Sequence, residues 1–194
     1  MSHEIEGTKR VRDTLDFVFR PVLDGFVEAN MKAKHGLRWL HYASRSAGQG
    51  PNDALDVYGL CKTILDNWNE VFGARFDRKT VHKARRLVST VFEARNATSH
   101  LNLPLSDPEA LTFLWAIAET AILLKAPSET IDQIKAVYAA QRSTGIEAGK
   151  IDPATPSEPK LVEEPKPSAQ LDLSGNEAQG KALKPWIEVA LPHP

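Results

Sequence analysis

Residues 88–100 read VSTVFEARNATSH, and this stretch decides the fold because an apolar helical stripe ends there in polar side chains. With about 100° of rotation per residue, one side of a helix over 78–100 carries the apolar residues Val81, Ala84, Val88, Val91 and Phe92. Arg95 falls in the centre of this stripe, and Ser99 follows on the same line. Asn96 and His100, four residues apart, lie together on its flank. The sequence therefore predicts a helix whose buried side ends in a cluster of Arg, Asn, Ser and His.

The position of Arg95 on an apolar stripe calls for a partner, because a guanidinium is almost never left unpaired on a buried face. Three interpretations are open. Arg95 pairs with an internal acid such as Glu70 or Glu93, it lies in an interface between protomers, or it lines a cleft that receives an anion. Taken alone, a structural ion pair is the commonest of these outcomes.

The same helix is locally basic. Between residues 75 and 95 its cations are Arg75, Arg78, Lys79, Lys83, Arg85, Arg86 and Arg95. They outnumber the acidic residues there, so the helix can attract phosphate although the chain's net charge is −1. Lys83, Arg85 and Arg86 are the candidate contacts. The alternative, a solvated helix face, explains the lysines but not Arg95.

The remaining sequence up to residue 145 also has helical spacing, and no sustained alternation predicts strands. Further helices are expected over residues 8–34, 53–72 and 107–125 and from 127 onward. Pro21 must kink or restart the first of them, because proline lacks the N–H and clashes with the previous turn. Asp107 is the expected N-cap of the fourth helix, with Pro108 in its first turn. The fold class predicted is all-α, an antiparallel four- to five-helix bundle.

A long loop ending at residues 48–51 is expected between the first two helices. Its basic and aromatic residues are Lys32, Lys34, His35, Arg38, Trp39, His41, Tyr42 and Arg45. Interleaved in this way, such side chains can stack on and neutralise a single-stranded nucleic acid, with Arg38 and Trp39 as candidate contacts. The alternative, which we favour, is a solvated loop with Trp39 and Leu40 tucked into the bundle.

The composition indicates which cellular compartment and which kinds of site to expect. Cys61 is the single cysteine, so a disulfide scaffold is excluded and a reducing compartment is expected. The N-terminus has no apolar region typical of a signal peptide, and no run of about 18 apolar residues predicts a membrane span. We therefore expect a cytoplasmic protein without a membrane partner. No Asp/His cluster has metal-ligand spacing, so neither a metal nor a cofactor is expected.

The composition changes near residue 145. Residues 146–194 hold eight of the 13 prolines, and their five lysines and eight acidic residues leave a balance of −3. Such a segment cannot bury enough apolar surface to offset its ordering entropy. The organisation expected from composition is a helical domain over 1–145 followed by a disordered linker over 146–182.

Residues 175–182, GNEAQGKA, nearly fit a phosphate-binding P-loop. Ala182 stands where a Ser or Thr would bind magnesium, and no apolar strand precedes the segment. Pro185 would also break the helix that must follow. We therefore expect no ATP binding within these residues.

The spacing Arg95-x4-His100, with polar Asn96 directly after the arginine, resembles the signature of the HEPN superfamily, whose members are helical bundles. Residues 60–72, LCKTILDNWNEVF, look like the helix that precedes the motif in the Swt-type HEPN branch, and residues 88–100 look like its motif helix. The similarity covers roughly residues 8–125.

A second resemblance lies at the other end of the chain. Residues 182–189, ALKPWIEV, together with 192–194, PHP, are similar to the opening of large ATP-binding proteins encoded in prokaryotic defence or DNA-modification islands. Some of these carry a Swt-type HEPN domain in front. The resemblance implies that residues 183–194 are the start of a following module or a truncated end. It also implies an ATPase partner or a C-terminal fusion, in a defence or stress system.

The HEPN resemblance implies RNA endonuclease activity at the cleft of a homodimer. Arg95 and His100 would be catalytic, with Asn96 orienting His100 or holding a phosphate oxygen. A histidine titrates near neutral pH, and an arginine offers a bidentate fork to phosphate, so cleavage through the ribose 2′-OH needs no metal. The candidate RNA-binding residues are Lys83, Arg85, Arg86, Arg38 and Trp39.

One histidine per chain fills one proton role, and a two-fold dimer would bring a second copy. The expected products are a 2′,3′-cyclic phosphate and a 5′-OH. The alternative is a non-catalytic dimerisation or protein-interaction module, in which Arg95 and His100 are interface or capping residues. A third interpretation is a toxin held inactive by a partner.

Overall fold

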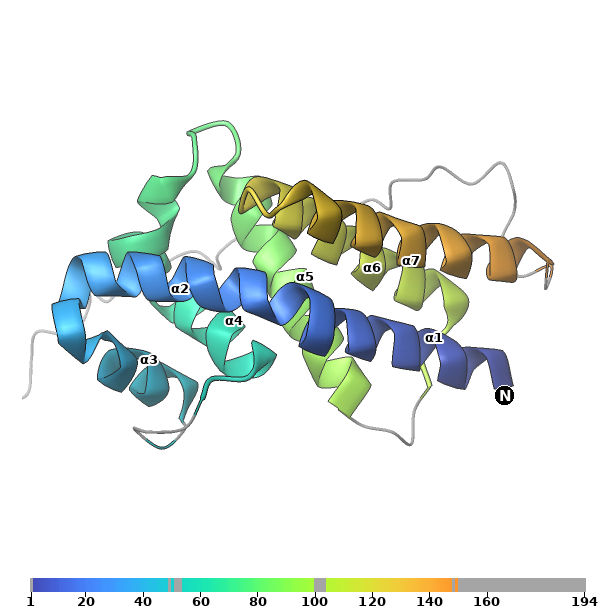
Figure 1. Ribbon diagram of the computed structural model, residues 1–194, viewed down its shortest axis with the longest axis horizontal. Helices are drawn as coiled ribbons and strands as arrows, with labels where there is room; N and C mark the ends of the chain where they lie inside the picture. Colours follow the sequence, from blue (N-terminus) through green and yellow to red (C-terminus); the bar gives the residue numbers. More distant parts are fainter. Residues whose placement is uncertain (1, 49, 51–53, 100–103, 148, 150–194) are drawn as a thin grey trace, which may run out of the picture. The chain divides into compact units, whose positions relative to one another are not determined.

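Helices joined by short connections form most of the part of the chain that the structure describes, which is residues 2–48, 50, 54–99, 104–147 and 149 (Figure 1). The structure is a computed structural model. Its α-helices are α1 Ser2–Asp13, α2 Arg20–His35, α3 Trp39–Ala47, α4 Val57–Asp66, α5 Val81–Ser99, α6 Asp107–Leu123 and α7 Ser128–Glu147. Between them lie the π-helical turns η1 Thr14–Phe19 and η3 Trp68–Phe72 and the 3₁₀ turns η2 Gly36–Arg38 and η4 Gly73–Arg75. No strand occurs in these ranges, so the all-α class predicted from the sequence is confirmed.

Helix α1, turn η1 and helix α2 follow one another end to end as a single long rod (Figure 1). Its buried stripe is spaced by four residues throughout: Val11, Leu15, Phe19, Leu23, Val27 and Met31. A four-residue spacing drifts around an α-helix, and the wider π turn brings it back into line. Pro21 lies in the first turn of α2, directly after η1, where the Arg20 N–H bonds to the Leu15 carbonyl. Pro21 was expected to kink or restart the helix, and α2 begins one residue before it, after the π turn.

The prediction of a long loop after the first helix is wrong, because this segment folds into η2 and α3. Ala43 and Ala47 are buried on the inner side of α3, and Gly48 ends the helix with a φ of 70°. Trp39 and Leu40 pack against the core as partly buried side chains, so that part of the expectation is confirmed. Alanines make a narrow apolar stripe, so the helical spacing of these residues gives only a weak signal in the sequence.

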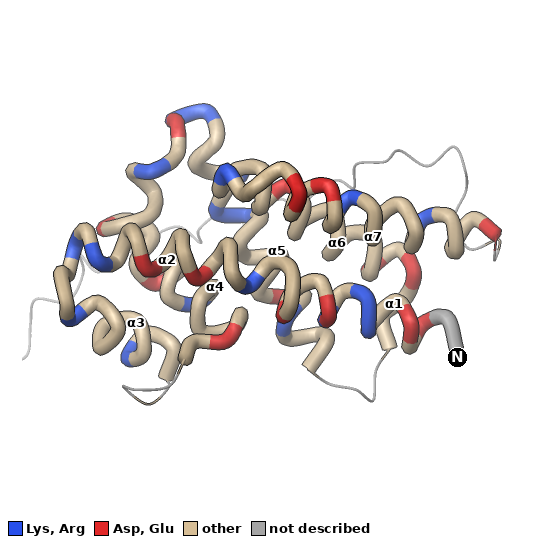
Figure 2. The backbone as a smooth tube through the Cα atoms, viewed as in Figure 1, with Lys and Arg blue, Asp and Glu red and all other residues tan. Residues whose placement is uncertain are grey.

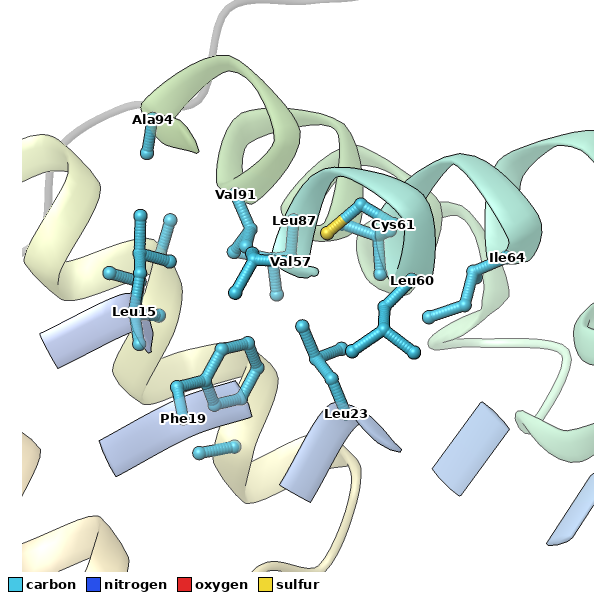
Figure 3. Packing of buried hydrophobic residues seen from close by; sticks show 14 of the residues in the cluster. Leu15, Phe19, Leu23, Val57, Leu60, Cys61, Ile64, Leu87, Val91 and Ala94 are labelled. Atoms are coloured by element: carbon cyan, nitrogen blue, oxygen red, sulfur yellow. The ribbon is translucent and has the colours of Figure 1, made fainter. Parts of the chain in front are cut away.

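The core forms where α4 and α5 meet the α1–α2 rod. Figure 3 shows the side chains that interlock there: Leu15, Phe19, Leu23, Val57, Leu60, Cys61, Ile64, Leu87, Val91 and Ala94. Truncating a fully buried leucine in such a core to alanine typically costs about 2–5 kcal/mol. Helix α4 is shorter than the predicted 53–72, because Asn67 leaves the α conformation and the chain continues as η3.

Helix α6 packs against α5, α7 and α1, in agreement with its apolar composition. Its N-cap is Ser106, which forms a capping box with Glu109, so the predicted N-cap Asp107 is wrong. Asp107 is instead buried in the first turn, where its Oδ1 accepts from Nε2 of Gln141 on α7 at 2.9 Å. Gln141 also accepts from Nη1 of Arg10 at 3.1 Å, so one amide ties α1, α6 and α7 together.

All the described helices lie in the first of two compact units, Met1–Val162. Of the second unit, Glu163–Pro194, no residue is described. The expectations for a linker over 146–182 and a further module over 183–194, including the rejected P-loop, therefore fall almost wholly outside the described residues. None of the described helices combines the length and the apolar character needed to cross a bilayer.

Candidate functional site

The buried side of α5 ends differently from the prediction. Ala94 and Thr98 are 0% and 1% exposed, whereas the Arg95 side chain is 29% exposed and Ser99 lies at the surface. The buried side of α5 therefore runs through Ala94 and Thr98, one residue before the expected positions Arg95 and Ser99. Placing Arg95 and Ser99 in the centre of the stripe was wrong, because the small residues Ala94 and Thr98 let α5 pack closely there.

Arg95 forms an ion pair within its own bundle. Its Nη2 donates to Oδ2 of Asp56 at 2.8 Å, so Asp56 is the internal acid. The two partners suggested from the sequence, Glu70 and Glu93, are exposed and do not fill this role. The other carboxylate oxygen of Asp56, Oδ1, accepts from the Gly59 N–H at 2.9 Å and caps α4. Because both side chains of the pair remain partly exposed, at 29% and 36%, it contributes about 1 kcal/mol or less to stability.

Beside this ion pair lies a groove of about 580 Å³. Its lining residues are Arg12, Asp16, Phe17, Arg20, Asp56, Arg95, Thr98 and Ser99. Three guanidinium groups face two carboxylates, a formal balance of +1. Phe17 is 76% exposed and offers an open aromatic face. Such a groove can receive an anion and stack a planar ring, so Arg95 both pairs with an internal acid and lines a cleft.

The outer side of the α1–α2 rod supplies one wall of the groove. Arg12, Asp16 and Arg20 follow one another at four-residue spacing, and Phe17 lies in the π turn η1. These four residues were missed in the sequence. Their regular spacing beside the apolar stripe is a signal of a charged helix face. That this face meets the end of α5 is a tertiary contact between distant segments, which the spacing cannot indicate.

The three candidate catalytic residues differ in how the structure places them relative to the groove. Arg95 lines the groove. Asn96 is half-buried and is not among the lining residues. His100 lies outside the described residues, directly after Ser99, which ends α5 and lines the groove. The Ser99 hydroxyl donates to the Arg95 carbonyl at 2.6 Å and so is held against the helix.

The candidate RNA-binding residues are not among those that line the groove. Lys83 is exposed and pairs with Glu119 of α6 at 2.7 Å, while Arg85 is exposed and Arg86 half-buried on α5. Arg38 is exposed in η2, and the half-buried Trp39 begins α3. The arginines that the structure brings together with Arg95 are Arg12 and Arg20 instead.

Neither a nucleophilic thiol nor a metal cluster is found near the groove in the described ranges. Cys61 is fully buried, and burial, with a smaller contribution from the negative charge of Asp56, raises the pKa of its thiol far above the usual range. A thiol of this kind is inert in the native state. Among the described residues, no group of three or more His, Cys, Asp or Glu is placed to hold a metal ion.

Comparison with known proteins covers most of this region, although Arg12 and Asp16 of the groove precede the matched residues. The model of the family described as Swt1-like HEPN matches residues 17–125, more than half of the 194-residue chain. The match begins at Phe17 in η1 and includes Asp56, Arg95 and His100. Searches of curated proteins and of solved structures found no match. The chain therefore belongs to the Swt1-like HEPN family.

Proposed function

We propose that this domain cleaves RNA in the groove through the ribose 2′-OH, without a metal ion. The observation that carries the proposal is the convergence of three arginines, Arg12, Arg20 and Arg95, on one groove at the end of α5. Arg95 belongs to the Arg-x4-His motif, and the helix that carries it ends one residue before His100. Membership of the HEPN family supports an RNase or a helical interaction module, and the charged groove favours the former.

Arg95 is suited to holding the scissile phosphate. A guanidinium has five N–H donors, and the bond to Asp56 engages Nη2. The side chain stays partly exposed, so donors remain for phosphate oxygens. Asp56 fixes the direction of the guanidinium, while Arg12 and Arg20 add positive charge for the anionic phosphorane.

His100 supplies the proton transfer in this proposal. An imidazole titrates near neutral pH and can act as base or as acid. The 2′-oxygen attacks phosphorus as its proton is removed, and the 5′-oxygen leaves as it receives one. The products are a 2′,3′-cyclic phosphate and a 5′-OH. Asn96 would orient the imidazole or hold a phosphate oxygen.

A homodimer completes the proposed site. One His100 fills one proton role, and two-fold symmetry would place a second copy of the motif at the same cleft. Phe17, 76% exposed at the groove, is available to contact either a base of the RNA or the second protomer. The resemblance of residues 182–194 to the opening of large ATP-binding proteins supports a place in a prokaryotic defence or stress system.

The test is to incubate the full chain with structured RNA in excess EDTA. Cleavage in the wild type and in Lys135→Ala, an exposed control on α7, is expected to persist. Cleavage in Arg95→Ala and His100→Ala is expected to fall by about a hundredfold or more. Absence of cleavage by the folded wild-type chain, at any enzyme excess, contradicts the proposal.

A second function is favoured by the same ion pair. Because Asp56 engages Arg95 inside the bundle, the motif arginine can serve to join α4 to α5. The domain would then be a non-catalytic interaction module that presents a partner protein to an ATPase. A large drop in melting temperature for Arg95→Ala, with no cleavage by the wild type, would favour this function.

A further inference from the structure

A second basic surface lies at the far end of the α1–α2 rod from α1. Residues 29–52 contain four Lys or Arg and two His but no Asp or Glu. They cover the end of α2, η2 and α3, and Figure 2 shows Lys and Arg there with no acidic residue on α3. Such a segment attracts anions whatever the net charge of the chain.

Arg38, the last residue of η2 and the N-cap of α3, forms a stripe of basic and aromatic residues with the outward side of α3. Arg38, His41, Tyr42 and Arg45 are spaced i, i+3, i+4 and i+7, and all four are exposed. Residues at this spacing lie on one face of a helix, so Arg38 and Arg45 are two turns apart with the rings between them.

Tyr42 forms a platform within this stripe. Its ring stacks on His35 of α2, with ring centroids 4.3 Å apart and an angle of 21° between the planes. The side chain remains 43% exposed. His35 thus holds the tyrosine in place while part of the ring stays open to a planar ligand, which lowers the entropy lost on stacking.

Three cations at this end of the rod have no carboxylate partner in the part of the chain that the structure describes. Within the described residues, Lys34, Arg38 and Arg45 form no ion pair with an acidic side chain, and all three are exposed. Lys32 differs, because it pairs with Glu28 one turn earlier on α2. Three charges therefore remain for a ligand's phosphates.

The apolar residues of the segment argue against a lipid surface. Trp39 and Leu40 pack against the core, and the inner side of α3 is buried at Ala43 and Ala47. Leu37 is 98% exposed, but one leucine does not make the broad apolar face with which a helix inserts into a bilayer. Charge and stacking, the features of single-stranded nucleic acid binding, are what this surface offers.

We propose that the α3 surface, formed by Lys34, His35, Arg38, His41, Tyr42 and Arg45, binds single-stranded RNA at a site separate from the groove. A base stacks on Tyr42, and flanking phosphates pair with Arg38 and Arg45. The inference rests on the proposed function for the identity of its ligand. In this proposal the α3 surface holds the RNA that the groove would cleave.

The test measures binding of a fluorescent 2′-O-methyl oligouridine, which lacks the free 2′-OH and so cannot be cleaved by the proposed route. Arg38→Gln/Arg45→Gln is compared with Lys125→Gln/Lys135→Gln, which removes two exposed charges elsewhere. The slope of log affinity against log salt is expected to fall by about 1.4 in the first variant, at about 0.7 per phosphate contact, and to stay unchanged in the control. Tyr42→Leu is expected to weaken binding about tenfold, and Tyr42→Phe to restore it.

Equal effects in the two charge variants, or no binding by the folded wild type, overturn the inference. Vesicles with and without phosphatidylserine form a second arm, and loss of vesicle binding without loss of oligouridine binding also overturns it. If the wild type cleaves RNA but the α3 variants bind oligouridine unchanged, only this inference is contradicted. If binding depends on the α3 surface but no RNA is cleaved, only the proposed function is contradicted.

Discussion

Asp56 joins the start of α4 to the end of α5 through its two carboxylate oxygens. Oδ1 accepts from the Gly59 N–H at 2.9 Å, and Oδ2 accepts from Nη2 of Arg95 at 2.8 Å. One side chain therefore caps a helix and directs the motif arginine of another toward the groove. The two roles can be separated by substitution, since asparagine caps helices as well as aspartate does but carries no charge.

The change Asp56→Asn is expected to lower the free energy of unfolding by less than about 1 kcal/mol, because it removes a partly exposed ion pair and keeps the cap. Asp56→Ala also removes the cap and is expected to cost about 1 kcal/mol more. Urea unfolding of both variants measures the difference. If the two variants are equally unstable, the capping role of Asp56 is wrong.

Cys61 should make stability depend on alkaline pH. Its pKa is raised in the native state by burial, whereas an unfolded thiol titrates near about 8.5. Above a pH of about 8.5 the unfolded thiol loses its proton while the buried thiol keeps it. The free energy of unfolding is therefore unaffected by Cys61 below the unfolded pKa and falls above it, by up to about 1.4 kcal/mol per pH unit. Unfolding followed from pH 7 to 10 should show this slope in the wild type and a smaller one in Cys61→Ala. An identical slope in both chains would contradict the assignment.

Glu109 should act in the opposite direction at acid pH. Hydrogen bonds from the Ser106 hydroxyl, and then from its N–H, lower the pKa of the Glu109 carboxyl. A lowered folded pKa gives stabilisation that is present above the unfolded value of about 4.3 and is lost as pH falls through the folded value. Glu109→Gln, which keeps an acceptor but does not titrate, should reduce the loss of stability below pH 4. An unchanged acid profile would show that the capping box at α6 is not linked to protonation.

Gln141 is expected to be the polar residue that fixes α7 to the rest of the bundle. Its Nε2 donates to buried Asp107, so Gln141→Leu removes this donor from a desolvated carboxylate. The expected cost is about 1–3 kcal/mol. Gln133→Leu, an exposed change on the same helix, should stay within about 0.5 kcal/mol. Similar melting curves for the two variants would rule out this role.

The sequence indicated the helices well where a broad apolar stripe marks the buried side. The α1–α2 rod, α4 and α6 bury side chains such as Leu15, Leu60 and Leu114, whose spacing is readable without coordinates. Helix α3 was missed because its buried side consists of small residues that leave a weak signal. The capping box at Ser106 was missed because Asp107, an equally good cap by type, follows it directly.

The candidate site was predictable only in part. The motif residue Arg95 stood out because an arginine near an apolar stripe needs a partner. Its partner Asp56 could not be identified, since the N-cap of α4 and the end of α5 meet only in the fold. The same holds for Arg12 and Arg20, which reach the groove through packing of the rod against α5.

The proposed cleavage of RNA in the groove through the 2′-OH leaves characteristic ends on the products, and these ends are the sharpest test of it. RNA is incubated in EDTA with the wild type, Arg95→Ala and His100→Ala, and the fragments are analysed by mass spectrometry. We expect 2′,3′-cyclic phosphate and 5′-OH ends from the wild type, and about a hundredfold less product from either variant. Fragments with other ends, or equal amounts of product from the three chains, would contradict it.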